Sequence, residues 1–212
     1  MQNRITYLRG VFRSWVNARN RKRLHNTSFS LICSNCTGCI LLHELGLKYN
    51  SPFVNLWMKP KDFIKCVANL KEYMAADLKF IDEPGIDYPI GLLKDIKIYF
   101  QHYSSDAEAL NKWNERKKRI NYKNLFIMMT DRDGCTLEDI VAFNKLPYSN
   151  KIIFTHIQYP EIHSAFYIKG FETQNSVGMC FDFINTFSSK KYYDQFDYIA
   201  WFNKPCQDTA LQ

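Results

Sequence analysis

Residues 29–45 read FSLICSNCTGCILLHEL, and the architecture of the chain can be worked out from them. The apolar run 29–33 is typical of a buried strand, the polar residues 34–38 of a tight turn, and residues 39–45 of a helix. Further short apolar runs alternate with helical patterns along the chain. This alternation indicates βαβ units, so we expect an α/β protein with a mixed, largely parallel sheet.

The chain of 212 residues is 46% apolar, which is enough for one domain with a sizeable core and excludes a disordered linker. We expect a basic arm over residues 1–26 and a single α/β domain over 27–212. Ser105 and Thr136 are each followed three residues later by an acidic residue, which is the signal of a helix start. Further strands are predicted at 51–57, 78–81, 96–100, 125–129, 151–155, 166–171 and 179–183, and further helices at 60–75, 105–120, 136–146 and 191–202.

The excess positive charge of the chain lies in its N-terminal arm. The first 25 residues contain seven of the 28 basic residues and no acidic residue, which leaves 21 basic and 21 acidic residues in the rest. Apolar residues recur at helical spacing between Ile5 and Val16, with arginines between them, so we expect a basic amphipathic helix. This helix either lies on an anionic membrane surface through residues 4–23 or packs on the domain or a partner. Nucleic-acid binding is not expected, because few aromatic residues are interleaved with the basic ones.

No run approaches the roughly 18 to 20 consecutive apolar residues of a membrane-spanning helix. Arg9 and Arg13 interrupt the apolar positions where a signal peptide would need an uninterrupted stretch. Seven cysteines, an odd number in a chain of this length, fit a reducing compartment with free thiols. We therefore expect a cytoplasmic protein, peripheral on the inner face of the membrane if its arm binds lipid.

Reactive residue types follow four of the predicted strands. In open α/β sheets ligands bind at the carboxyl ends of the strands, so side chains that are distant in sequence converge there. The sequence thus predicts one site built from several strand ends. The residues that follow these strands are Ser34, Asn35 and Cys36, then His102, then Asp131, Arg132 and Asp133, and finally His156.

Cys36 is the predicted nucleophile of this site. It lies where a strand turns into a helix, and a helix N-terminus lowers the pKa of a thiol and favours the thiolate. His102 is the predicted base and Asp131 or Asp133 its orienting carboxylate, while backbone N–H groups near Cys36 stabilise an oxyanion. A buried cysteine that only fills space, and histidines that are only hydrogen-bonded, are the plainer alternatives. Residues expected to contact substrate are Ser34, Asn35, Gly38, Asn55, Arg132 and His156.

Two metal hypotheses compete with the cysteine mechanism. Cys33, Cys36 and Cys39 have a spacing that iron–sulfur and zinc sites use, but no second Cys-x-x-Cys pair supplies further ligands, and we assign no metal ligand. Asp131 and Asp133 form an Asp-x-Asp pair like the one that holds a divalent cation in many nucleotide-sugar glycosyltransferases. The same two residues also fit a plain helix-capping turn.

Five short motifs follow one another along the domain, namely SNCTG at 34–38, LGLKYNSPFV at 45–54, YPIG at 88–91, HY at 102–103 and DRDGC at 131–135. Together they resemble a bacterial family of proteins labelled exopolysaccharide biosynthesis, over about residues 27–171. The family's first motif reads SNNCxGG, so Cys36 and Gly38 match it and Cys39 replaces its second glycine.

The resemblance implies a three-layer α/β/α fold with a mixed sheet and a role in assembling capsule or another surface glycan. The cysteine at a strand-turn-helix is also similar to that of polysaccharide acetyltransferases. We therefore expect a transferase that moves an acyl group, with coenzyme A as donor, to the hydroxyl of a sugar or glycan intermediate. The alternatives are a glycosyltransferase with a cation on Asp131 and Asp133, and a non-catalytic scaffold of a glycan-assembly complex.

Overall fold

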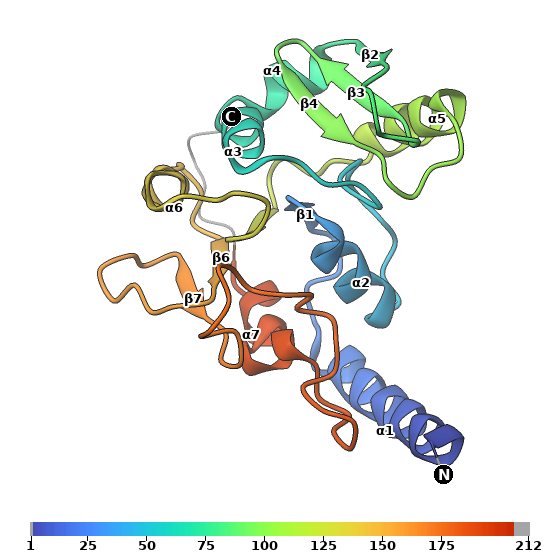
Figure 1. Cartoon of the computed structure of the whole chain (residues 1–212), viewed down its shortest axis with the longest axis vertical. Helices are drawn as coiled ribbons and strands as arrows, with labels where there is room; N and C mark the ends of the chain where they lie inside the picture. Colours follow the sequence, from blue (N-terminus) through green and yellow to red (C-terminus); the bar gives the residue numbers. More distant parts are fainter. Residues whose placement is uncertain (1, 206–212) are drawn as a thin grey trace.

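The computed structural model describes residues 2–205, and a sheet of four parallel strands lies at its centre (Figure 1). The order of its strands is β1-β5-β6-β7, and all three pairings are parallel. Parallel neighbours need crossover connections, and helices α5 and α6 lie in two of them. The strands of this sheet are β1 (Ser30–Cys33), β5 (Leu125–Thr130), β6 (Lys151–Thr155) and β7 (Ala165–Tyr167).

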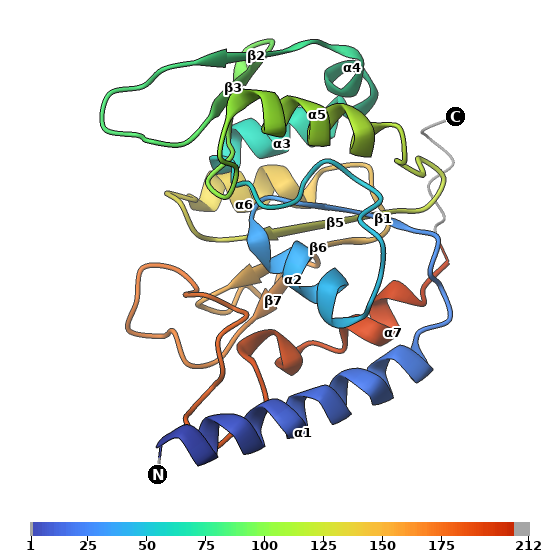
Figure 2. The same cartoon turned by 90° about the vertical axis from the view of Figure 1, so that its right-hand side faces the viewer.

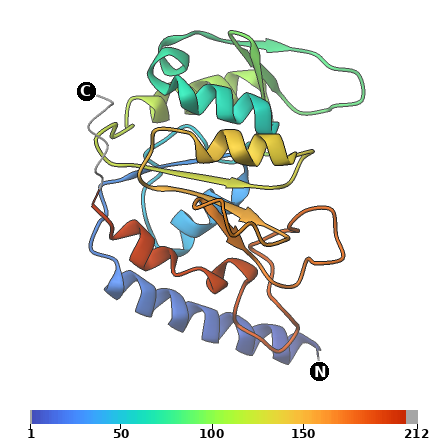
Figure 3. The same cartoon turned by 90° about the vertical axis from the view of Figure 1, so that its left-hand side faces the viewer.

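Alternate residues of the central strands enter two separate hydrophobic cores. Ile32 and Ile127 face one core, together with side chains of α3, α4, α5 and α6, whereas Leu31 and Phe126 face the other, with α2 and α7. Helices therefore cover both faces of the sheet, as Figures 2 and 3 show, and the three-layer α/β/α prediction is confirmed. The helices are α2 (Cys36–Glu44), α3 (Pro60–Ala68), α4 (Leu70–Ala75), α5 (Asp106–Lys117), α6 (Leu137–Asn144) and α7 (Tyr198–Phe202).

A second, antiparallel sheet packs into the first of these cores. It is formed by β2 (Leu78–Ile81), β3 (Ile90–Leu93) and β4 (Ile96–Tyr99). The strand that precedes His102 belongs to this sheet, so His102 does not come from the carboxyl edge of the parallel sheet as the sequence analysis expected. The mixed character of the fold thus comes from two sheets, one parallel and one antiparallel.

Two predicted strands are irregular segments in the structure. Residues 51–57 form no strand beyond a single bridge between Trp57 and Tyr99, and in 179–183 only Phe183 makes a bridge. Asn55 adopts a left-handed backbone conformation with φ of 58°, which breaks the extended path of the first segment. The apolar residues of 51–57 are nonetheless buried, because this segment crosses between the two sheets as a covered loop.

Two predicted helices are interrupted. The predicted helix 60–75 divides at Asn69, whose backbone leaves the helical region, into α3 and α4. The predicted helix 191–202 is reduced to a short 3₁₀ turn, η1 (Tyr192–Gln195), and α7, with Phe196 and Asp197 between them. The capping boxes lie as predicted, since the side chain of Ser105 accepts from the amide of Glu108 and Thr136 caps α6.

The N-terminal arm is a helix, α1 (Gln2–Arg23), that lies along the outer side of α7 (Figures 2 and 3). Its inner face is polar, and Arg13 at the centre of that face is 5% exposed. The guanidinium of Arg13 pairs with Glu44 and Asp194 and donates to the hydroxyl of Tyr193 at 2.9 Å. Ion pairs and hydrogen bonds therefore attach α1 to the domain. Within residues 2–205, no helix combines the length and apolarity needed to cross a bilayer.

Candidate functional site

The segment from β1 to α2 places Cys36 at the first turn of a helix. Asn35 is the N-cap of α2, and its side-chain oxygen accepts from the amide of Thr37 at 3.1 Å. The side-chain nitrogen Nδ2 of Asn35 donates to the hydroxyl of Thr130 at 2.7 Å, and this bond links the turn to the end of β5. Asn35 and Cys36 are therefore held at the carboxyl edge of the parallel sheet.

Gly38 lets α2 approach β1. A Cβ atom at this position would lie 2.6 Å from Cβ and 3.0 Å from Sγ of Cys33, closer than side chains pack. Gly38 is buried and lies outside the pocket described below, so the structure explains this glycine by packing.

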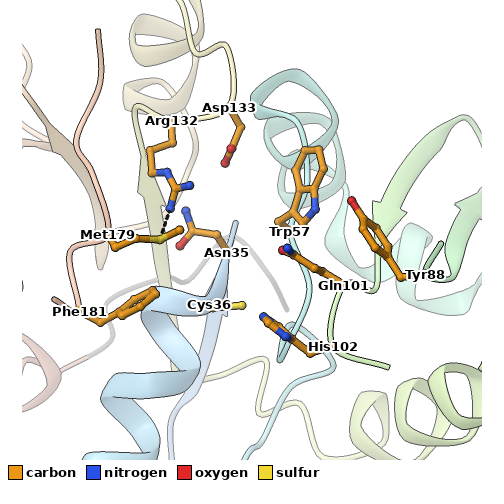
Figure 4. A pocket seen from close by; sticks show the side chains of 10 residues that line it. All are labelled: Asn35, Cys36, Trp57, Tyr88, Gln101, His102, Arg132, Asp133, Met179 and Phe181. Atoms are coloured by element: carbon orange, nitrogen blue, oxygen red, sulfur yellow. Dashed lines mark hydrogen bonds between the residues drawn. The ribbon is translucent and has the colours of Figure 1, made fainter. Parts of the chain in front are cut away.

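A pocket of about 400 Å³ opens beside Cys36 (Figure 4), a size in the range of roughly 300 to 1,000 Å³ of small-molecule sites. It lies between the carboxyl edge of the parallel sheet, the turn after β4 and the segment 177–181. Aromatic rings and polar side chains share its walls. The lining residues are Asn35, Cys36, Trp57, Tyr88, Gln101, His102, Arg132, Asp133, Met179 and Phe181.

Cys36 and His102 face each other across this pocket. Figure 4 shows the thiol of Cys36 pointing toward the imidazole of His102. His102 lies on a turn that closes when the amide of Tyr103 donates to the carbonyl of Phe100, and the hydroxyl of Tyr103 donates to the carbonyl of Val54 at 2.8 Å. The sequence analysis expected Cys36 and His102 in one site but at the edge of a single sheet, whereas the structure brings them to one cavity from two different sheets.

Arg132 and Asp133 line the opposite side of the pocket from His102 (Figure 4). A guanidinium nitrogen of Arg132 lies 2.9 Å from the sulfur of Met179. Asp133 has a positive φ of 60° and turns its carboxylate toward the cavity; desolvation by the surrounding protein raises its pKa, against the charge of Arg132. Within residues 2–205, no hydrogen bond or ion pair joins a carboxylate to His102, so the expected orienting contact is not formed there.

Asp131 lies outside the pocket and binds His156 and the backbone of Val177. Its carboxylate is buried, accepts from the amides of Val177 at 2.7 Å and His156 at 2.8 Å, and pairs with Nδ1 of His156 at 2.5 Å. Neither Asp131 nor His156 lines the pocket. Asp131 instead fixes the segment that begins at Val177 and carries two pocket residues, Met179 and Phe181.

Asp131→Asn is expected to lower the free energy of unfolding by about 1 to 3 kcal/mol, because one amide nitrogen then faces donors that need an acceptor. The same change should weaken binding in the pocket, since its wall at 177–181 loses an anchor. Urea denaturation and ligand titration would measure both effects. Asp133→Asn is the matched control, because the carboxylate of Asp133 lines the pocket and, within residues 2–205, holds no backbone amide or ion pair, so its stability should change by less than about 0.5 kcal/mol. Equal stability losses in the two variants would contradict this role of Asp131.

The side chains of Cys36 and Cys39 are electrostatically coupled, which the sequence did not predict. The side-chain interaction with Cys39, together with burial, raises the pKa of Cys36. The same interaction lowers the pKa of Cys39 to about 7. The sequence analysis expected the helix N-terminus to lower the pKa of Cys36, but the negative charge of the pair rests first on Cys39. Only the Cys36 sulfur reaches the pocket.

Two other predicted contact residues lie outside the pocket lining. Ser34 is buried, and its backbone bonds to Met128 and Met58. The side-chain oxygen of Asn55 lies 3.5 Å from the sulfur of Cys39. Asn55 therefore contacts Cys39, which neighbours Cys36, and does not line the cavity itself.

The sequence analysis missed five pocket residues. Two of them had a signal, since Tyr88 opens the YPIG motif and Gln101 precedes His102. Trp57 and Phe181 were placed in predicted strands and so were not considered for a site. The ring of Trp57 stacks on Tyr99 with centroids 4.0 Å apart, which fixes it at the pocket wall. The fifth residue, Met179, is 42% exposed.

Within residues 2–205, no group of three histidine, cysteine or acidic side chains is arranged to hold a metal ion. Cys33, Cys36 and Cys39 follow one another along β1 and α2, and all three are free thiols. Asp131 and Asp133 point to different surroundings, one into the protein and the other into the pocket. Cys206, considered as an isolated cysteine in the sequence, lies outside the described residues.

Two comparisons show which proteins this chain resembles. A Haemophilus influenzae protein named "Uncharacterized protein" is 48% identical over 191 residues, which cover 90% of this chain and 92% of that protein. A family described as a domain of unknown function, DUF1919, matches residues 7–203, which include most of α1 and every pocket residue. The chain therefore belongs to the DUF1919 family.

Proposed function

We propose that this protein is a transferase of surface-glycan biosynthesis that moves an acyl group onto a sugar hydroxyl. One observation carries the proposal: a thiol, Cys36, and an imidazole, His102, face one another in a cavity of small-molecule size. A nucleophile and a base that share a pocket are the minimum equipment for acyl transfer through a covalent intermediate. The resemblance of the five sequence motifs to exopolysaccharide proteins supports the glycan part of the proposal.

The lining of the pocket suits a sugar. Trp57, Tyr88 and Phe181 offer flat apolar surfaces against which the C–H face of a sugar ring can pack. Gln101 carries both donors and acceptors, and Asn35 keeps one N–H and one oxygen lone pair beyond its bonds to Thr130 and Thr37, which match the hydroxyl groups of a carbohydrate. Aromatic walls with a few directed polar groups are the usual composition of a specific small-molecule site.

The reaction divides into two balanced steps. In the first, the Cys36 sulfur attacks the carbonyl carbon of an acyl thioester, the carbon–sulfur bond of the donor breaks, and the donor leaves as a thiol with the proton that Cys36 has lost. In the second, His102 takes the proton of the sugar hydroxyl, whose oxygen attacks the acyl carbon, and the Cys36 sulfur leaves and recovers that proton. Coenzyme A is the simplest donor of this class.

Cys39 contributes to the first step from behind Cys36. Its pKa of about 7 means that the pair carries a negative charge near neutral pH. As the Cys36 sulfur attacks the donor, its proton passes to the neighbouring thiolate of Cys39, which later returns it to the leaving thiol. Cys39 is therefore a positioning and proton-holding residue, and Cys36 the nucleophile.

Glycosyl transfer through a cation on Asp131 and Asp133 has less support. Such a cation would need both carboxylates at one point, but the carboxylate of Asp131 is occupied by His156 and the amide of Val177. A scaffold without chemistry would use the same pocket for binding alone, and the next experiment separates it from a transferase.

The test is to capture the acyl-enzyme. The full chain is incubated with acetyl-coenzyme A and its intact mass is measured, followed by peptide mapping. We expect one acetyl group on Cys36 in the wild-type protein and none in Cys36→Ala. Cys135→Ala is the matched control, since Cys135 is a partly exposed thiol outside the pocket, and it should acylate like the wild type.

Sugars and nucleotide sugars are then added to the acylated protein. A true acceptor should release the acetyl group faster than water does and should appear as an acetylated product. Acetylation that persists in Cys36→Ala, or a wild-type protein that no short-chain acyl-coenzyme A labels, would contradict the acyltransfer proposal. In that case sugar binding without turnover would identify a binding module.

A further inference from the structure

The helix α1 buries its polar face and exposes its apolar face, the opposite of an ordinary surface helix. Its polar side chains Arg13, Asn17 and Asn20 are turned toward the domain and are buried, with Asn20 donating to the hydroxyl of Tyr198 at 2.7 Å. An amphipathic helix that packs on a core normally buries its apolar stripe. Here the apolar stripe is left for something outside the chain.

The outer face of α1 carries a contiguous row of large apolar residues. The row consists of five residues, which are half of the exposed large apolar side chains of residues 2–205. The other five are divided among α6 and separate loops. Successive members of the row are one or three residues apart, and Tyr7–Val11 and Leu8–Phe12 are four apart, so they lie on one side of the helix. The exposed fractions are 72% for Tyr7, 53% for Leu8, 49% for Val11, 60% for Phe12 and 75% for Trp15.

Cationic side chains border this row at both ends. Arg4 lies four residues before Leu8, while Arg19 and Lys22 lie four and seven residues after Trp15, and all three cations are exposed. A shallow hollow of about 240 Å³ lies between Trp15, Arg19 and Lys22. An aromatic ring beside two cations around a hollow is a suitable receptor for an anionic headgroup.

The geometry points to the outer face of α1 as the surface by which this protein binds the headgroup region of an anionic membrane. The helix of 22 residues is about 33 Å long and lies on the outside of the domain, so it can lie flat on a bilayer without unfolding. Its apolar row enters the interface while Arg4, Arg19 and Lys22 meet lipid phosphates.

The charge distribution indicates that the partner of this helical face is an anionic membrane. The chain has a net charge of +7, and the residues after 25 contain equal numbers of basic and acidic side chains. The attractive field is therefore concentrated on the helix that also carries the exposed apolar row. This combination of apolar and cationic side chains on one exposed helical face matches interfacial helices, which combine apolar burial with attraction to anionic lipid.

The test uses the full chain and vesicles of phosphatidylcholine with or without phosphatidylserine, separated by flotation. We expect binding to the vesicles with phosphatidylserine, little binding to phosphatidylcholine alone, and release as salt rises. The double variant Arg19→Ser/Lys22→Ser should bind roughly 30-fold more weakly, at about 1 kcal/mol per charge. Phe12→Ser/Trp15→Ser should weaken binding at least about 100-fold, because two large side chains no longer enter the interface.

The matched control is Leu137→Ser/Val141→Ser, which removes two exposed apolar side chains from α6 on the other side of the sheet. It should bind vesicles like the wild type. Circular dichroism and unfolding curves of all variants should coincide with the wild type, because every substituted side chain is exposed.

Absence of vesicle binding by the wild-type chain would overturn the inference, as would equal binding to neutral and anionic vesicles. A control pair that loses as much binding as the α1 pair would do the same. A wild-type dimer in solution that Phe12→Ser/Trp15→Ser converts to a monomer would assign the face to a second copy of the chain instead. None of these results depends on whether Cys36 is acylated.

Discussion

Arg13→Ala is expected to lower the free energy of unfolding by about 3 to 5 kcal/mol, the usual cost of removing one partner from a buried ion pair. Arg13 is 5% exposed and contacts two carboxylates, Glu44 and Asp194. Without the guanidinium, both carboxylates lose their closest positive charge in a site that water reaches poorly. Lys191 alone remains, 2.7 Å from Glu44. Urea denaturation followed by circular dichroism would measure the loss.

The pH dependence of this cluster tests the same contact. Burial alone would raise the pKa of Glu44, but hydrogen bonds from Arg13, Lys191 and Tyr193 outweigh it and hold that pKa below its ordinary value of 4.5. The unfolded chain then binds more protons than the folded one, so this stabilisation is present above pH 4.5 and is lost as the pH falls through the folded pKa. The stability difference between wild type and Arg13→Ala should therefore shrink in acid.

Arg19→Ala is the control for this prediction. Arg19 lies on the same helix but is exposed, and its loss should change the free energy of unfolding by less than about 0.5 kcal/mol. A loss for Arg13→Ala that is as small as that of Arg19→Ala, or a difference that does not change with pH, would show that the ion cluster does not hold α1 on the domain.

His102→Ala is expected to slow transfer to the sugar by about 10² to 10⁴-fold, the usual contribution of a positioned general base. The first step should survive, because Cys36 has Cys39 to receive its proton. The variant should therefore accumulate acyl-enzyme, and its KM for the sugar should change less than kcat. Rapid-quench measurement of both steps, with acetyl-coenzyme A as donor, separates the two effects.

His43→Ala is the matched control, since His43 is exposed on α2 outside the pocket and its removal should leave both steps unchanged. Transfer by His102→Ala at the wild-type rate would exclude His102 as the base. Loss of Cys36 acylation in the same variant would instead indicate that His102 acts in the first step.

The sequence predicted the central strands because each is a short, mostly apolar run bounded by turn residues. It also predicted that Cys36, His102 and Asp133 would share a site. The sequence did not reveal that His102 follows a strand of the antiparallel sheet, because a run as short as β4 does not show which of two sheets it joins. Asp131 and Asp133 are only two residues apart, and the positive φ of Asp133 decides which carboxylate reaches the pocket. No composition rule predicts that angle.

The sequence also did not show which face of α1 packs on the domain. Helical periodicity separates apolar from polar positions, but it does not say which set faces the domain. That choice depends on Glu44 and Asp194, which lie in distant segments and provide buried partners for Arg13. The match shows membership of DUF1919, a domain of unknown function, while the resemblance to exopolysaccharide proteins stays a prediction.

The carboxylate of Asp131 links the backbone of two segments that are otherwise separate. The amides of His156 and Val177 donate to its two oxygens, so breaking this carboxylate's contacts exposes both amides to water at once. Hydrogen–deuterium exchange should then occur at similar rates at the two amides, as in one cooperative unit. A ligand that contacts Met179 or Phe181 would favour the closed state of that unit, and it would slow exchange at His156 without touching it.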